Sequence, residues 1–315
     1  MVTGGGISGG IPGGIPQAIP KGIPGGIHAV LYALFDADER LDRAAMRVQV
    51  DRMVAQGCDG ITVLGLATEV AKLTSVERMA LIDMVADDLG GRLPLSVTIA
   101  GNSVAEQAAT ARHAAGAGAT WLILQPPMVG TYDAGVYLDF MARVAATTAL
   151  PLAIQNAPQY LGRSLSPDDL AVLSARCPNL AGIKAEDAAT GIAALAAAAP
   201  GLTVLGGRGG IEMTDCLRAG ATGFVLAPDI APRARRILTL WQAGDRDGAE
   251  ALYAHSLPGI LFTMQSLEHL ICYGKRIFAA HAGLTVHDRQ PALAPTASGL
   301  DLAAQWAGLL KESAT

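Results

Sequence analysis

Short apolar runs alternate with longer alanine-rich stretches along the chain from residue 28 onward. The runs are rich in Val, Ile and Leu. The stretches between them carry Ser at expected helix starts, acids in first turns and Gly near expected ends. The eight runs are HAVLYALF, GITVLGL, LPLSVTIA, TWLILQPP, LPLAIQN, LAGIKA, LTVLGG and TGFVLA. Eight strands, each followed by a helix, predict an α/β fold of the (β/α)8 TIM barrel type.

The competing fold is a doubly wound open sheet, which requires a glycine-rich fingerprint after its first strand. The segment ALFDADERLD has no such fingerprint. We therefore expect a barrel core over residues 27–229. Residues 230–315 are mostly helical and exceed what a barrel requires, so we expect the last barrel helix there, followed by a C-terminal helical extension.

The first 26 residues have a different character, because they repeat Gly-Ile-Pro in low complexity. A proline at every fourth position prevents a helix or a central strand. We expect residues 1–26 to form an extended or flexible arm, with packing of its isoleucines along a neighbouring surface as the alternative.

The composition limits the classes of function that the protein can have. With 51% hydrophobic residues, a net charge of -5 and no block of Lys and Arg, the chain has material for a large core and lacks the footprint of a nucleic-acid or membrane-surface binder. Four widely spaced cysteines form no metal-ligand pattern, which favours reduced thiols in the cytoplasm and no metal. No apolar run reaches the roughly 20 residues of a membrane span. We expect small-molecule partners.

A lysine stands at the end of the sixth expected strand, in the segment NLAGIKAED. Active sites of TIM barrels lie at the carboxyl ends of the strands, and burial there favours the neutral, nucleophilic amine that a Schiff base requires. The alternative is that the ammonium of Lys184 reaches solvent at the barrel mouth.

Other strand ends also carry polar residues. The turn after the second strand places Thr68, Glu69 and backbone amides such as that of Ala67 at the mouth, where amides suit a carboxylate. The fifth strand ends in Gln155 and Asn156, whose side-chain amides can bind oxygens but cannot transfer protons.

A GGRGG segment follows the seventh strand, where barrels often bind phosphate. Gly207 and Arg208 are therefore candidates for an anion nest or for contacts to a substrate carboxylate or hydroxyl groups. The alternative is that these glycines only permit tight turns around the pocket.

Taken in order, these motifs resemble the dihydrodipicolinate synthase and N-acetylneuraminate lyase superfamily of class I aldolases, over about residues 27–312. The resemblance rests on Gly65 and Glu69 followed by LT, on QPP after the fourth strand, on an Asn-x-Pro after the fifth and on GIK in the sixth. It implies a tetramer or dimer, and an imine between Lys184 and the keto group of pyruvate or another 2-keto acid, without a further cofactor.

Departures from the pattern change the expected reaction. Members of the superfamily usually carry Gly-Thr-Thr-Gly-Glu and a tyrosine as general acid/base before Asn-x-Pro, where this chain has GLATE and Gln155. The position of the second family tyrosine is Met128, and the position of the synthase arginine falls at Tyr160, with Arg163 three residues later. Lysine biosynthesis is therefore disfavoured.

The chain is more similar to the 2-keto-3-deoxy sugar acid dehydratases, especially those acting on L-2-keto-3-deoxyarabonate. These have Gln-Asp-Ala-Pro where this chain has QNAP, and an acid two residues after the lysine, as Glu186 stands here. A GG-x-GG turn and an Arg-x-Pro near the C-terminus, residues 289–291 here, are further similarities.

The leading hypothesis is a Schiff-base lyase that dehydrates a 2-keto-3-deoxy sugar acid. Lys184 is the expected nucleophile, and Glu69 or Glu186 the expected proton carrier; Glu69 could instead be a structural acid, and Glu186 could instead cap the next helix. The expected substrate-binding residues are Ala67, Thr68, Gln155, Asn156, Gly207 and Arg208. The alternatives are a retro-aldolase that releases pyruvate and a 2-keto acid-binding barrel that has lost turnover.

Overall fold

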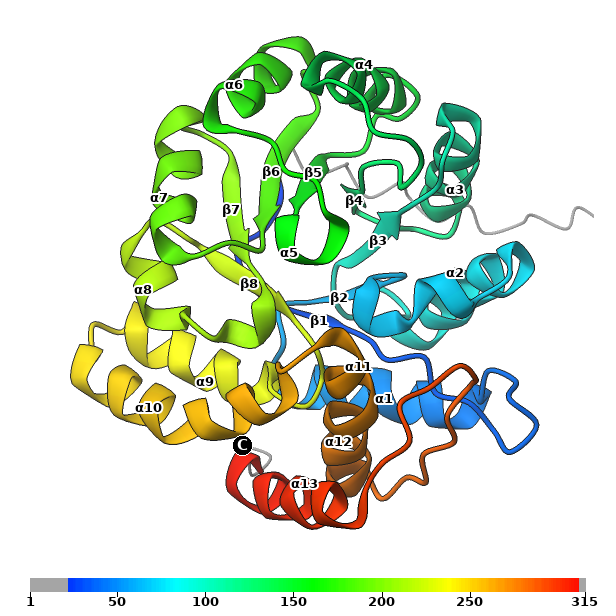
Figure 1. The fold of residues 1–315 in the computed structure, drawn as a ribbon, viewed down its shortest axis with the longest axis vertical. Helices are drawn as coiled ribbons and strands as arrows, with labels where there is room; N and C mark the ends of the chain where they lie inside the picture. The colour runs from blue at the N-terminus through cyan, green and yellow to red at the C-terminus, as the bar shows by residue number, and fades with distance from the viewer. Residues whose placement is uncertain (1–21, 312–315) are drawn as a thin grey trace, which may run out of the picture.

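A closed barrel of eight parallel strands forms the centre of the molecule, and each strand pairs with the next until β8 returns to β1 (Figure 1). The computed structural model describes residues 22–311, so most of the predicted arm lies outside the described residues. The strands are β1 Gly26–Val30, β2 Gly60–Val63, β3 Leu95–Ile99, β4 Trp121–Leu124, β5 Leu152–Asn156, β6 Leu180–Ala185, β7 Thr203–Gly206 and β8 Gly223–Leu226. The predicted (β/α)8 barrel is confirmed.

Helices surround the barrel, as the ring of coiled ribbons in Figure 1 shows. The main ones are α1 Arg43–Ala55, α2 Ser75–Leu89, α3 Val104–Gly116, α4 Ala134–Ala145, α6 Pro167–Arg176, α7 Ala189–Ala198, α8 Met213–Arg218 and α9 Ala231–Gln242. Short turns of helix lie in the loops: η1 Leu66–Thr68, η2 Val70–Lys72, α5 Pro158–Leu161 and η3 Arg208–Gly210. Within the described part of the chain, no helix is both long and apolar enough to span a membrane.

Local sequence fixes several helix starts. Thr74 and Glu77 form a reciprocal capping box at the start of α2, and Ser166 and Asp169 do the same for α6. Each box satisfies backbone amides that have no partner inside the helix. These starts therefore follow from residues within one turn of the boundary.

The packed chain begins before the boundary that we predicted at residue 26. Ile23 is buried, and its carbonyl oxygen accepts a hydrogen bond of 2.8 Å from the Thr203 hydroxyl. Strand β1 already begins at Gly26. The end of the Gly-Ile-Pro segment belongs to the barrel because an isoleucine gains more by packing under the strands than by staying in water.

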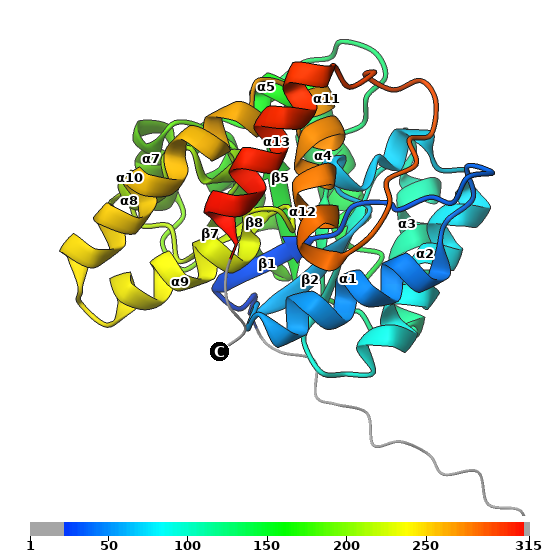
Figure 2. The ribbon, with the colours of Figure 1, turned by 90° about the horizontal axis from the view of Figure 1, so that it is seen from below.

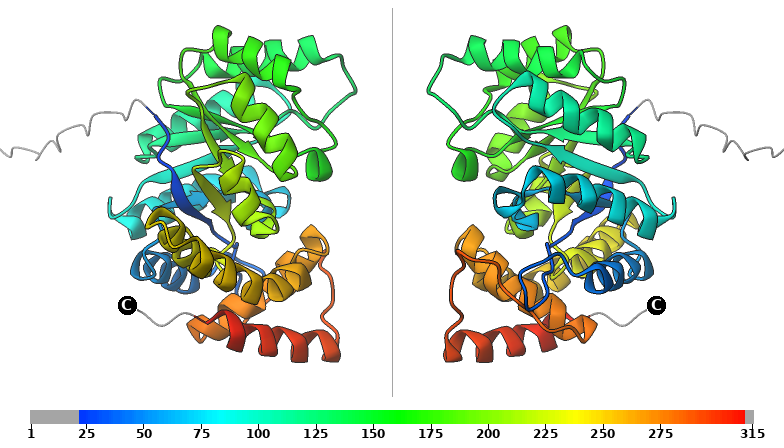
Figure 3. Two further views of the ribbon diagram at one scale, coloured as in Figure 1. Left: turned by 90° about the vertical axis from the view of Figure 1, so that its left-hand side faces the viewer. Right: turned by 90° about the vertical axis from the view of Figure 1, so that its right-hand side faces the viewer.

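The predicted C-terminal helical extension is present as α10 Arg246–Thr263, α11 Leu267–His269, the π-helical segment η4 Leu270–Gly274, α12 Lys275–Ala282 and α13 Ala297–Leu310. Helix α12 packs against α1 and α13, and α10 packs against α9 (Figure 2). These helices form a layer along one side of the barrel (Figure 3). The extension also reaches the barrel mouth, because Leu267 and Leu270 line the pocket described below.

Candidate active site

Lys184 lies near the carboxyl end of β6, and its side chain is buried in a pocket at the barrel mouth. Its ammonium donates a hydrogen bond to Oε1 of Glu186, two residues later. Side chains alternate along a strand, so the two residues share one face. The alternative of a solvent-directed lysine does not describe this geometry, because only 6% of Lys184 is exposed.

Glu186 faces the lysine and does not cap the next helix. The residue before α7 is Ala188, and the amide of Ala189 donates to Oε2 of Glu212 at 2.6 Å. Glu186 is itself 5% exposed. Lys184 and Glu186 thus form a buried ion pair, in which the carboxylate can hold the ammonium or accept its proton.

A row of side-chain amides leads to this pair. Gln125 donates to Oε1 of Gln155 at 2.8 Å, and Gln155 donates to Oε1 of Glu186 at 2.7 Å. Gln155 stands directly beside Lys184 in the pairing of β5 with β6. The row fixes the orientation of the Glu186 carboxylate, because each amide can donate only through its nitrogen. Sequence reasoning gave no role to Gln125.

Arg208 and Tyr160 also line the pocket. Arg208 has a left-handed backbone with φ of 51°, and its Nη1 lies 3.7 Å from Oε1 of Glu212. Within the described residues, its buried Nε has no hydrogen-bond partner. Burial and the nearby Glu186 raise the pKa of Tyr160, and Arg208 opposes the shift. The lining of the pocket therefore includes an arginine whose buried Nε is available to a ligand.

Gly207 makes room for Glu186. A Cβ atom at this position would lie 2.6 Å from Cγ of Glu186, which no real side chain tolerates. The structure thus supports the view that this glycine permits a close approach, although the position was predicted as a substrate contact.

Ala67 and Thr68, which are neighbours in the turn after β2, have different surroundings. Ala67 lines the pocket with Lys184. Thr68 is fully buried, and its hydroxyl donates to the carbonyl oxygen of Leu31 at 2.6 Å. The amide of Thr68 donates to Gly65 within the turn. Thr68 therefore holds the turn against β1, and Ala67 is the residue that reaches the pocket.

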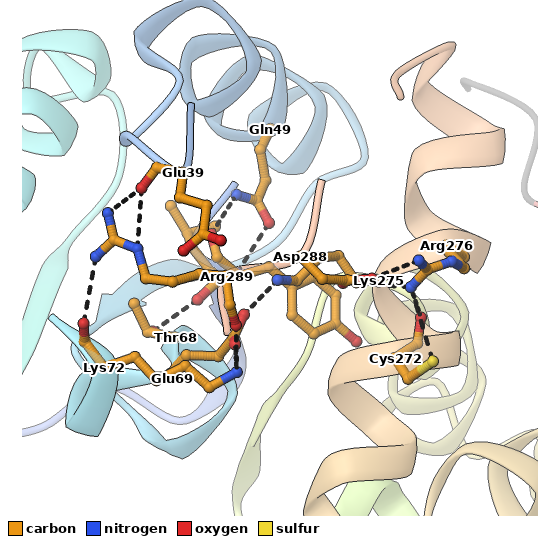
Figure 4. Close-up of polar contacts among 12 residues, drawn as sticks. Glu39, Gln49, Thr68, Glu69, Lys72, Cys272, Lys275, Arg276, Asp288 and Arg289 are labelled. Carbon is orange, nitrogen blue, oxygen red and sulfur yellow. Dashed lines mark hydrogen bonds and ion pairs between the residues drawn. The ribbon is translucent and has the colours of Figure 1, made fainter. Parts of the chain in front are cut away.

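Glu69 does not line the pocket that contains Lys184. Lys72 donates to its Oε2 at 2.6 Å, and the fully buried Lys275 donates to its Oε1 (Figure 4). Burial lowers the pKa of Lys275, and the Glu69 carboxylate counteracts the shift. Both oxygens thus accept hydrogen bonds from ammonium groups, and Lys275 joins the turn to helix α12. This geometry matches the alternative that Glu69 is a structural acid.

Asn156 also lies outside the pocket lined by Lys184. Its Oδ1 accepts from the amide of Leu165 at 2.7 Å, and its Nδ2 donates to the Leu165 carbonyl at 3.2 Å. As the neighbour of Gln155 on the strand, it points to the other face. The side chain fastens the loop that follows α5.

The model of the dihydrodipicolinate synthetase family matches residues 23–298. This chain belongs to that family. It is 31% identical over 227 residues to the L-2-keto-3-deoxyarabonate dehydratase of Azospirillum brasilense, an alignment that covers 69% of this chain and 72% of the relative. It is 26% identical over 224 residues to the Escherichia coli K12 protein named "Probable 2-dehydro-3-deoxy-D-pentonate aldolase YjhH", with 69% and 74% covered.

The fold agrees with solved structures of the family. YagE of E. coli K12, crystallised in complex with pyruvate, superposes with a TM-score of 0.82 at 24% identity, over 91% of this chain and 97% of YagE. At this identity the likeness shows the fold alone. Together with the family match, it makes the chain a barrel enzyme of the dihydrodipicolinate synthetase family. The relatives named above are called a dehydratase and a probable aldolase.

Sequence reasoning missed one acid in this family member's pocket. Asp229 follows β8, lines the pocket and is 2% exposed. Tyr32, directly beyond β1, donates its hydroxyl to Oδ1 of Asp229 at 2.8 Å. Burial raises the pKa of Asp229 to about 6, against the hydrogen bonds from Tyr32 and from the backbone. An acid within three residues of a strand's carboxyl end was the available signal.

Proposed function

We propose that this protein is a Schiff-base lyase that dehydrates a 2-keto-3-deoxy sugar acid, with Lys184 as the nucleophile. The observation that carries the proposal is the buried Lys184–Glu186 pair at the mouth of a barrel of this family. The carboxylate of Glu186 is placed to accept the ammonium proton, which frees the amine to attack a carbonyl carbon. Among the described residues, no group of three or more His, Cys, Asp or Glu side chains that could hold a metal ion is found.

Glu186 has the first proton-transfer role. It accepts the ammonium proton of Lys184 so that the amine can attack C2 of the keto acid. It then returns this proton to the hydroxyl group of the carbinolamine, which leaves as water when the iminium forms, and Glu186 is again a carboxylate. The iminium then acidifies the C3–H bond, which is next to it. Gln155 holds the Glu186 carboxylate in position throughout but exchanges no proton.

Arg208 is the proposed partner of the substrate carboxylate. Its guanidinium reaches the same pocket as Lys184, and its Nε is buried without a partner among residues 22–311. A buried unsatisfied donor is costly unless a ligand uses it. Ala67 lies in the lining close to the turn, and its backbone could complete this contact.

Two other readings remain as alternatives. The name of YjhH and the pyruvate complex of YagE favour a retro-aldolase that releases pyruvate through the same imine. The name of the Azospirillum relative, and the amide at position 155, favour dehydration. A barrel that binds 2-keto acids without turnover is the third reading. Assembly as a tetramer or dimer stays a prediction.

Borohydride trapping tests the proposal. The protein is incubated with pyruvate and with a panel of 2-keto-3-deoxy sugar acids, reduced, digested and analysed by mass spectrometry. We expect a reduced adduct on Lys184, none in Lys184→Ala, and an undiminished adduct in Lys311→Ala, which removes an exposed lysine. Turnover by Lys184→Ala would contradict the proposal. Product analysis then separates the lyases, because only the retro-aldolase releases free pyruvate.

A further inference from the structure

A second buried acid shares the pocket lining with the lysine. Asp229 follows β8 and shares the lining with Lys184 on β6, and both side chains are almost fully buried. Glu186 is engaged by Lys184, and Glu69 is engaged by two lysines outside this pocket. Asp229 is thus the carboxyl group of the pocket that has no cationic partner among the printed contacts of the described residues.

Tyr32 holds Asp229 in place. The tyrosine hydroxyl donates to Oδ1 of Asp229. The backbone of Tyr32 forms two hydrogen bonds with the Gln49 side chain. The Tyr32 amide donates to Oε1 of Gln49, and Nε2 of Gln49 donates to the Tyr32 carbonyl, both at 3.0 Å. The Tyr32 hydroxyl thereby fixes the orientation of the Asp229 carboxyl group, and Gln49 fixes the backbone of Tyr32, as a preorganised site requires.

The C-terminal extension packs closely against Tyr32 and Asp229. Gly274 ends the π-helical segment η4, and a Cβ atom there would lie 2.5 Å from the Tyr32 hydroxyl and 3.2 Å from Oδ2 of Asp229. Only glycine lets this helix approach so closely. π-Helical segments are often found at functional sites.

We propose that Asp229, oriented by Tyr32, is the general acid that protonates the departing C4 hydroxyl group of the substrate. The inference rests on the proposed function, because it needs the Lys184 imine at C2. Asp229 is the catalytic residue in this step, and Tyr32 is a positioning residue.

The step balances without a further reactant. Glu186 takes the C3 proton, and the electrons of the C3–H bond form the C3=C4 double bond. The C4–O bond breaks with its electron pair on oxygen, which takes the proton of Asp229 and leaves as water. Glu186 has then gained one proton and Asp229 has lost one, and exchange with solvent restores both after the product leaves.

The acidity of Asp229 agrees with this role. Burial raises its pKa to about 6, so part of the population carries the proton near neutral pH. A general acid works best when its pKa lies close to the operating pH. The charged and titratable groups that face the pair or its pocket are Tyr32, Glu69, Tyr160, Lys184, Glu186, Arg208 and Lys275.

The experiment compares Asp229→Asn, Tyr32→Phe and a control, Asp215→Asn, which makes the same change at an exposed side chain of helix α8. Each variant is assayed for adduct formation at Lys184 and for kcat from pH 5 to 9. We expect Asp229→Asn to keep the adduct and to lose about 100-fold or more in kcat. The control should match the unaltered protein.

The dependence of kcat on pH distinguishes a catalytic role of Asp229 from a purely structural one. In the unaltered protein, kcat should fall as the pH rises through about 6, because the acid must be protonated. Tyr32→Phe removes a hydrogen bond that lowers the pKa of Asp229, so this limb should move to higher pH. Tyr32→Phe changes no charge and keeps the ring, so it decides the question even if Asp229→Asn does not fold.

Three results would overturn the inference. Unchanged kcat in Asp229→Asn would remove the acid role and leave the Schiff base standing. An unmoved pH limb in Tyr32→Phe would assign the limb to another group. Absence of any adduct in the unaltered protein would instead refute the proposed function, and this inference would fall with it.

Discussion

Gln155 donates a hydrogen bond of 2.7 Å to the same oxygen of Glu186 that accepts from Lys184. The amide lies on the neighbouring strand, in register with the lysine. A side-chain amide does not transfer protons, so we expect this position to orient the carboxylate, with proton transfer carried out by other groups of the pocket.

Replacing Gln155 by Leu should lower kcat without preventing adduct formation. A hydrogen bond to a charged group contributes about 1.5–3 kcal/mol, which corresponds to a loss of roughly 10- to 100-fold if it acts in the transition state. Steady-state kinetics measures the effect, with a 2-keto acid that forms the Lys184 adduct as the substrate. Gln125→Leu, one link further from the ion pair, should lose less. Equal losses in both variants would argue against the orienting role.

Gly207→Ala should reduce activity more than it reduces stability. The added methyl group would lie 2.6 Å from Cγ of Glu186, so the Glu186 side chain or the backbone at position 207 must shift, and we expect the contact of Glu186 with Lys184 to be disturbed. Overpacking of this kind costs about 1–3 kcal/mol. Gly135→Ala is the matched control, because a Cβ there meets nothing within 4 Å. Thermal unfolding and kcat should both stay near normal in the control. Normal kcat in Gly207→Ala would show that the carboxylate position tolerates displacement.

Glu69→Gln should destabilise the fold, because it leaves the buried ammonium of Lys275 without its counter-charge. Breaking a buried ion pair from one side costs about 3–5 kcal/mol. Urea unfolding measures the loss. The double variant Glu69→Gln/Lys275→Met removes both charges and should recover much of the stability. A stable Glu69→Gln protein that has lost only activity would instead support the predicted catalytic role of Glu69.

The Glu77–Arg289 pair should make stability depend on pH. Hydrogen bonding from Arg289 lowers the pKa of Glu77 from 4.5 to about 2. Because the folded-state pKa lies below the unfolded-state value, the contribution is fully present above about pH 5 and is lost as the pH falls toward 2.

The comparison of Glu77→Gln with the unaltered protein tests this pH dependence. Gln preserves the capping box at α2, so the variant isolates the charge. We expect a difference of about 1–2 kcal/mol in unfolding free energy at pH 7, shrinking as the pH is lowered to 3. Asp139→Asn, at an exposed ion pair, should show little change across the same range. A difference independent of pH would show that charge is not its source.

Much of the fold was readable because its signals are local. The apolar runs gave all eight strands, and capping residues such as Thr74 marked helix starts. The placement of Lys184 beside Glu186 was also accessible, since alternation along one strand puts residues i and i+2 on one face. The same rule explains why Gln155 faces the lysine and Asn156 does not.

The long-range pairings were decided by the tertiary structure. Glu69 meets Lys275 across 206 positions of the chain, and Tyr32 meets Asp229 across 197. No periodicity within one element records such a contact, because it exists only once the barrel closes and the C-terminal helices pack against it. The sequence by itself determined the barrel, its lysine and the acid beside it. Barrel closure and the packed extension decided that Glu69 is bound by lysines and that Asp229 lines the pocket with Lys184.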